Sequence, residues 1–168
     1  MALPPLACAR TRHQVVFLYE QTEDESVGVL LERGTAFNVN EMIPGLDEFS
    51  ENYLFTGGDD GGKAVLMVHA QVDLPGARPV GGSGLMVGGV QAARAAVASG
   101  ALPPTAFKFF FGRVALNAAD LAGMLRGGGW RCVSFVDPAA LPAAVLKNEV
   151  ANVAWRWVME LISDLMRI

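Results

Sequence analysis

The apolar residues of this chain come in short runs that glycine, proline or charged residues interrupt. The run from 109 to 114 is broken by Gly112 and Arg113. No stretch approaches the roughly 18 consecutive apolar residues that a membrane-spanning helix needs. Yet 52% of the residues are hydrophobic and the mean hydropathy is +0.33. We therefore expect a soluble intracellular protein without a membrane span, with a large core and with apolar surface reserved for other protein subunits.

Length and charge narrow the class of protein further. A chain of 168 residues fits one domain with a core of its own. The net charge is −4 and the arginines are scattered, so no basic field attracts nucleic acid, and direct nucleic-acid contact is expected only within an assembly. Cys8 and Cys132 are too few for a disulfide framework. The first residues lack the charged region and long apolar core of a secretion signal.

Six runs rich in β-branched or aromatic residues predict strands. They are residues 15–19, 27–31, 53–56, 63–69, 107–111 and 130–136. The first two flank a short acidic segment, which predicts a hairpin with a solvated turn. The third and fourth flank the glycine-rich residues 57–62, which predicts a second hairpin with glycines in its turn. The run 107–111 is predicted to be a central strand.

Helices are predicted at 38–42, 90–99 and 117–126, the last with Asn117 as its N-cap, and at 148–168. In the C-terminal helix the apolar positions recur at three-and-four spacing, which gives one apolar face. Trp155, Met159 and Met166 widen that face beyond one core contact. Either the helix has a wide core face, or these three residues bind a partner, and we name them as candidate partner-binding residues.

No set of residues predicts a catalytic, metal or cofactor site. His13 and His69 lack a second ligand at metal spacing. Ser83 and His69 with Asp73 would make a hydrolase triad, but Ser83 lacks the Gly-x-Ser-x-Gly turn of such nucleophiles. The loop 57–62 is followed by Lys-Ala and contains Asp59 and Asp60, unlike a phosphate-binding loop. We expect a non-enzymatic protein without a metal or cofactor.

Several segments together resemble the YqgE/AlgH family (UPF0301), with this chain as a divergent member of plant or algal type. Residues 15–20 and 27–31 are similar to the family's strand–loop–strand entry, and residues 55–58 to its Gly-Gly turn. The family has a conserved block of Phe-x-Gly-Tyr, Gly-Trp, Gly-Gln-Leu-Glu and a final Trp. This chain resembles that block at Phe111-Gly112-Arg113, Leu121 and Trp130. The resemblance implies an α+β fold whose mixed, largely antiparallel sheet curls into a pseudo-barrel with flanking helices. It implies no established enzymatic activity.

This chain departs from the family pattern mainly at polar positions. The departures, in chain order, are Gln21, Asp59, Arg113, Leu116, Asp120, Ala122 and Met124. The scaffold positions Gly112, Leu121 and Trp130 are kept. A ligand or surface that depends on the polar positions in relatives is therefore not expected to be the same here.

Two functional hypotheses follow, and a third, a hydrolase, requires Ser83 and His69 to lie within hydrogen-bonding reach of each other. The first is a non-catalytic interaction or structural subunit, within a large organellar assembly in the chloroplast or mitochondrion if the source is eukaryotic. The alternative is a regulator or small-ligand sensor that uses a cleft beside the glycine-rich residues 57–62 and 81–84. In both, residues 1–13 are an N-terminal extension and residues 14–168 form one domain that ends in the helix 148–168.

Overall fold

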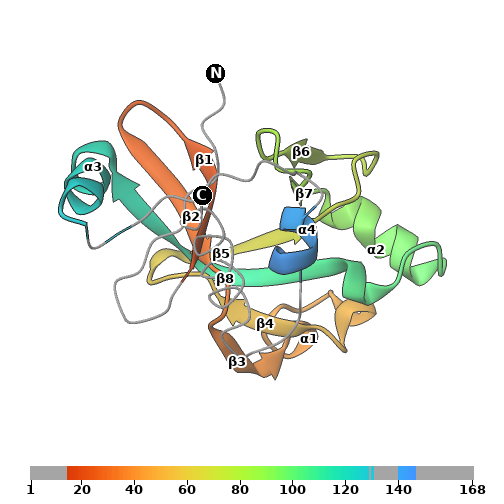
Figure 1. The fold of residues 1–168 in the computed structure, drawn as a ribbon. Helices are drawn as coiled ribbons and strands as arrows, with labels where there is room; N and C mark the ends of the chain where they lie inside the picture. The colour runs from red at the N-terminus through yellow and green to blue at the C-terminus, as the bar shows by residue number, and fades with distance from the viewer. Residues whose placement is uncertain (1–14, 129, 131–139, 147–168) are drawn as a thin grey trace.

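The computed structural model describes residues 15–128, 130 and 140–146 (Figure 1). Three of the predictions lie outside these residues. They are the N-terminal extension 1–13, the strand 130–136 beyond Trp130, and the helix 148–168 with Trp155, Met159 and Met166.

The described residues form strands and short helices in mixed order. The strands are β1 (Val16–Gln21), β2 (Glu25–Leu30), β3 (Gly34–Asn38), β4 (Tyr53–Thr56), β5 (Asp60–His69), β6 (Ala77–Pro79), β7 (Met86–Gly88) and β8 (Phe107–Asn117). The helices are α1 (Val39–Met42), α2 (Val90–Ala98), α3 (Ala118–Arg126) and α4 (Ala140–Val145), with 3-10 turns η1 (Asp47–Phe49) and η2 (Pro104–Ala106). None of the helices in these ranges is long and apolar enough to cross a membrane.

The strands form one mixed sheet centred on β8. Its main path runs β1-β2-β8-β5-β7-β6, with antiparallel neighbours, and β4 pairs with β8 in parallel while β3 pairs with β4. The sheet curls into a half-barrel with α2 and α3 outside it (Figure 1). The predicted α+β fold, with a largely antiparallel sheet curled into a pseudo-barrel, is therefore confirmed.

The first predicted hairpin is correct and the second is wrong. β1 and β2 pair directly, with Val16 opposite Leu30. β4 and β5, however, lie on opposite sides of β8, where Leu54 and Met67 both pair with Phe109. The glycine-rich segment between β4 and β5 therefore passes across β8, so β5 pairs with β8 on the other side and not with β4.

Three glycines allow this crossing, because backbone lies directly on backbone there. Gly112 of β8 has φ +72, and a Cβ atom on it would lie 2.3 Å from the carbonyl oxygen of Gly58. A Cβ atom on Gly57 would lie 2.4 Å from the carbonyl oxygen of Gly112. Atoms this close repel strongly, so only glycine fits at the crossing.

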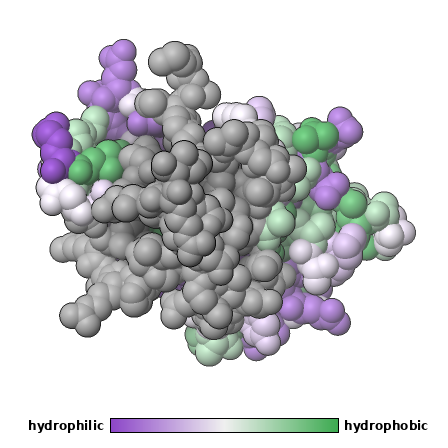
Figure 2. All heavy atoms as spheres, in the orientation of Figure 1, coloured by the Kyte–Doolittle hydropathy of each residue, from purple (hydrophilic) through white to green (hydrophobic). Residues whose placement is uncertain are grey.

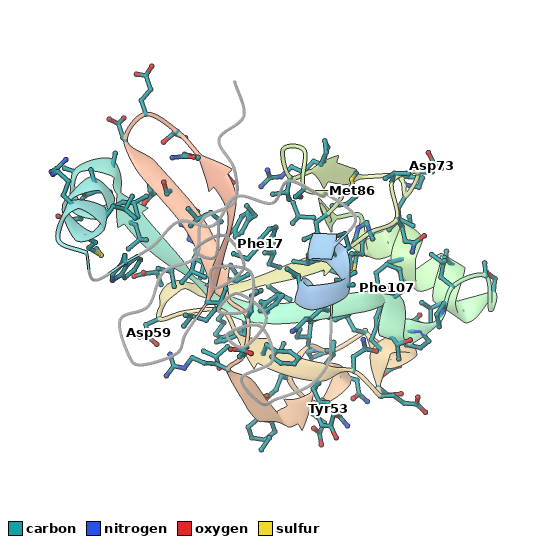
Figure 3. All side chains as sticks on the ribbon, in the orientation of Figure 1. Phe17, Tyr53, Asp59, Asp73, Met86 and Phe107 are labelled. Carbon is teal, nitrogen blue, oxygen red and sulfur yellow. The ribbon has the colours of Figure 1, made fainter. Side chains whose placement is uncertain are left out.

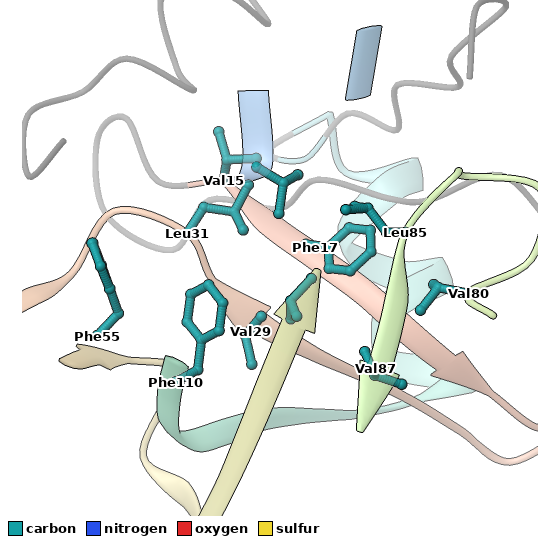
Figure 4. Packing of buried hydrophobic residues seen from close by; sticks show 11 residues of the cluster. Val15, Phe17, Val29, Leu31, Phe55, Val80, Leu85, Val87 and Phe110 are labelled. Carbon is teal, nitrogen blue, oxygen red and sulfur yellow. The ribbon is translucent and has the colours of Figure 1, made fainter. Parts of the chain in front are cut away.

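The alternation of side chains along β8 divides the core into two layers. Phe107 and Phe109 lie on the outer side of the half-barrel, where they are buried against Phe49, under α2 and η1. Phe110 faces the interior of the half-barrel and packs with residues of the other strands (Figure 4). Val145 of α4 is fully buried in that interior cluster. Since successive side chains of a strand alternate, Lys108 faces the same interior as Phe110.

Candidate functional site

The interior of the half-barrel contains a buried lysine. Lys108 is 2% exposed. Its Nζ atom donates hydrogen bonds of 3.1 Å to the backbone oxygens of Leu31, just after β2, and Val145 of α4. Nζ also lies 4.1 Å from the ring centroid of Phe55 and 5.5 Å from that of Phe110. One ammonium group thereby joins β8 to the end of β2, to β4 and to α4.

Burial changes the ionisation of this lysine. Loss of solvation lowers the pKa of Lys108 to about 8, and the nearby charge of Glu32 acts in the opposite direction. Sequence reasoning treated residues 107–111 only as a strand and missed this group. The sequence does contain a sign of it. A single lysine stands among aromatic residues, and Phe110, two residues further along and so on the same side of the strand, is apolar. A buried lysine of lowered pKa often marks a functional site, but here the ammonium group is enclosed by backbone and rings.

His69 and Ser83, the hydrolase pair considered from the sequence, are both buried and both bonded to backbone. The Ser83 hydroxyl donates to the oxygen of Val80 at 2.6 Å and accepts from the nitrogen of Leu85. His69 accepts from the nitrogen of Gln71 through Nδ1, so its Nε2 carries the proton and donates to the oxygen of Gly88 at 3.1 Å. Burial lowers the pKa of His69. Asp73 lies exposed on an outer loop (Figure 3).

The acidic and glycine-rich residues singled out in the sequence differ in their surroundings. Asp60 accepts a 3.2 Å hydrogen bond from the nitrogen of Ala115, while Asp59 is exposed and lies 3.9 Å from Arg33. Gly57 and Gly58 are buried at the crossing with β8, whereas Gly81 and Gly82 are exposed. Among the residues that the structure describes, no group of three His, Cys, Asp or Glu side chains is arranged to hold a metal.

Side chains bridge the two terminal strands of the curled sheet. Arg78 of β6 donates a 2.9 Å hydrogen bond to Glu20 of β1. Its guanidinium carbon also lies 6.0 Å from the ring centroid of Tyr19. Burial raises the pKa of Tyr19, and the charge of Arg113 partly offsets the shift. Arg113 thus contributes positive charge beside Tyr19.

Exposed large apolar side chains gather on β3, α1 and β4. Phe37 is 49% exposed, Met42 50% and Tyr53 48%, and we call the part of the molecule built by the three elements that carry them the β3–α1–β4 face. Asn38 at the end of β3 pairs with Tyr53 at the start of β4, and α1 follows β3 directly. These elements lie together at one end of the molecule, with Tyr53 at its margin (Figures 1 and 3). In Figure 2 pale green surface adjoins purple, hydrophilic surface along this lower edge. This face was not predicted from the sequence, because β3 was not predicted.

Comparison with known proteins agrees with this architecture. A protein from Corynebacterium diphtheriae is 18% identical, has a TM-score of 0.72, and the match covers 93% of this chain and 85% of that chain. The AlgH protein from Pseudomonas aeruginosa (UPF0301) is 19% identical, has a TM-score of 0.62, and the match covers 82% of this chain and 79% of that one. At such identities the likeness concerns the fold. A search of curated protein sequences finds no match.

The sequence itself matches a family profile over nearly its full length. The profile is that of DUF179, described as AlgH-like, and it covers residues 1–166. The resemblance first seen in short segments therefore extends across the whole fold. This chain belongs to the AlgH-like family DUF179.

Proposed function

We propose that this AlgH-like chain is a non-catalytic interaction subunit, and that it works within a larger organellar assembly. The observation that carries the proposal is the β3–α1–β4 face. Aromatic residues and methionine are enriched in protein–protein interfaces, and a cluster of exposed apolar side chains is stabilised when a partner buries it. Phe37, Met42 and Tyr53 are exposed side chains of these kinds on three neighbouring elements.

The bonding of the reactive groups also supports a non-catalytic role. Ser83 and His69 hold loops by hydrogen bonds to backbone, and Lys108 holds two backbone oxygens inside the core. A general base or a nucleophile has to reach its substrate. Each of these three side chains is buried. In the proposed assembly, Trp155, Met159 and Met166 supply a second partner contact.

The experiment is a native pull-down of the tagged full-length chain from its own cells, followed by sizing and mass spectrometry. The wild type is compared with the double variant Phe37→Ser/Tyr53→Ser. The matched control is Val72→Ser, which removes an apolar side chain that is 65% exposed in the turn after β5, outside the β3–α1–β4 face. We expect the wild type and the control to recover the same partner in a defined complex, and the double variant to lose it.

Two checks make this result decisive. Circular dichroism and thermal unfolding establish that the double variant is folded, since its two side chains are half exposed and contribute little to the core. A parallel variant with Trp155, Met159 and Met166 changed to serine tests the second contact. Recovery of the wild type as a free small protein contradicts the proposal and directs the search to a small ligand.

A further inference from the structure

We infer that the β3–α1–β4 face binds a basic amphipathic helix of a partner protein. This inference rests on the proposed interaction function and specifies the chemistry of the partner. It starts from the charge of the segment that builds the face. Between residues 34 and 59 there is no lysine or arginine. The acidic residues in that range are Glu41, Asp47, Glu48, Glu51 and Asp59.

Two of these carboxylates are neutralised within the chain. Glu48 accepts hydrogen bonds of 3.0 and 3.1 Å from Arg94, and this contact lowers the pKa of Glu48. Asp59 lies 3.9 Å from Arg33. Glu41, Asp47 and Glu51 are exposed, and they take no part in the ion pairs found within the described residues. The Glu41 carboxylate already accepts a hydrogen bond from the nitrogen of Asn38, so Asp47 and Glu51 are the carboxylates of this region that are available to a partner.

The two available carboxylates lie on segments that adjoin the elements with exposed apolar residues. Glu51 is two residues from Tyr53, which begins β4. Asp47 begins η1, which packs against α1. The face therefore combines exposed apolar side chains with negative charge on adjoining segments. Its complement is an apolar stripe flanked by lysine or arginine, because opposite charges at the rim of an interface accelerate and orient association.

The edge of β3 argues for a helix in preference to an added strand. A strand that extends a sheet needs free backbone donors along the edge. Successive nitrogens of a strand point to opposite sides, and that of Val39 donates to the oxygen of Asn52 on the β4 side, so the nitrogen of Asn38 lies on the open edge. It already donates to the Glu41 carboxylate at 2.6 Å. A side chain of this chain thus occupies a donor at the end of the edge strand. A helix needs no such donors, since it docks through side chains at helical spacing.

The direct test uses a synthetic helical peptide with leucines on one face and lysines and arginines on the other. Its binding to the full-length chain is measured by fluorescence anisotropy at low and at high salt. The comparison peptide keeps the leucines and replaces every basic residue with glutamate. We expect the basic peptide to bind, to lose about tenfold in affinity at high salt, and the acidic peptide not to bind.

Charge variants then locate the site. Asp47→Lys/Glu51→Lys removes rim carboxylates, and Glu23→Lys/Asp73→Lys makes the same change in net charge at exposed positions outside the face. We expect the first double variant to bind the basic peptide about tenfold more weakly than wild type. The second double variant keeps wild-type affinity. Equal weakening in both variants, or equal binding of the acidic peptide, overturns the inference.

The pull-down separates the two proposals. A partner that is lost with Phe37→Ser/Tyr53→Ser but retained with Asp47→Lys/Glu51→Lys supports the interaction function and overturns the basic helix. The absence of any partner for the wild type contradicts the interaction function itself. Sedimentation that shows self-association through Phe37 and Tyr53 identifies a second copy as the occupant, which also overturns the basic helix.

Discussion

A lysine enclosed by aromatic rings defines the chemistry of the interior at the scale of single residues. Taking an ammonium group out of water is costly unless hydrogen bonds and nearby negative charge compensate. Lys108 is compensated by two backbone oxygens, by the faces of Phe55 and Phe110, and by the charge of Glu32. The compensation is incomplete, because the pKa of Lys108 still falls to about 8.

The ionisation of Lys108 makes stability depend on pH. A lysine in the unfolded chain titrates near pH 10.4, whereas Lys108 in the folded chain titrates at about 8. Between these values the unfolded chain binds more protons, so the free energy of unfolding rises as pH increases. We expect the wild type to gain up to about 3 kcal/mol over this range relative to Lys108→Met.

The measurement is urea denaturation of both proteins from pH 7 to pH 10. Other titrating groups cancel in the difference between wild type and variant. Lys63→Met, at an exposed position on β5, serves as the control and should track the wild type at every pH. A wild-type minus Lys108→Met difference that stays flat with pH contradicts the assigned pKa shift.

At the scale of elements, the connection between β4 and β5 crosses β8, and this crossing determines which strands pair in the sheet. The sequence indicated both strands, since β-branched and aromatic runs mark them locally. It also indicated the β1–β2 hairpin and the helix capped by Asn117, whose Oδ1 accepts from the nitrogen of Asp120 at 2.7 Å. The prediction that β4 and β5 form a hairpin was wrong, because glycines in a turn and glycines at a strand crossing look alike in sequence. Only the long-range position of Gly112 distinguishes them.

Alanine at the crossing tests this reading of the glycines. Gly112→Ala would place Cβ 2.3 Å from the oxygen of Gly58, so backbone has to move. Gly62→Ala has a similar positive φ of +57 but meets nothing within 4 Å. We expect Gly62→Ala to cost about 1 kcal/mol of unfolding free energy and Gly112→Ala to cost more than about 3 kcal/mol.

Thermal and urea unfolding of the two variants measure the difference. The pair is matched, because both substitutions add one methyl group at positive φ and differ only in the space around it. Equal costs would mean that backbone conformation alone, and not the crossing, requires glycine at residue 112.

At the scale of the whole molecule, the half-barrel is joined along an open seam by side chains. β1 and β6 are the ends of the sheet path, and Arg78 reaches Glu20 and Tyr19 across the gap between them. The sequence predicted the family, because short segments along the chain carry the resemblance, and the resemblance in turn implied the fold class. It did not predict the seam, Lys108 or the β3–α1–β4 face, because each depends on residues that are distant in sequence.

Loss of the seam contact should loosen the edges without unfolding the protein. The side chains of Arg78 and Glu20 are 54% and 48% exposed, so their ion pair contributes less than about 1 kcal/mol. We expect Arg78→Ala to leave the unfolding midpoint nearly unchanged and to increase hydrogen exchange in β1 and β6. Arg33→Ala breaks an exposed ion pair elsewhere and should leave exchange in those strands unaltered. A large drop in midpoint for Arg78→Ala would contradict this picture.

The central position of β8 has a consequence for how the chain is made. β8 pairs with β2, β4 and β5, all of which precede it in the chain. During synthesis those strands leave the ribosome before the strand that joins them, so the middle of the sheet cannot close until residue 117 has emerged. Until then β4 and β5 carry unpaired edges, which invite wrong pairing or a chaperone. Assembly is therefore governed by the late arrival of β8, and its long-range contacts should make folding slow.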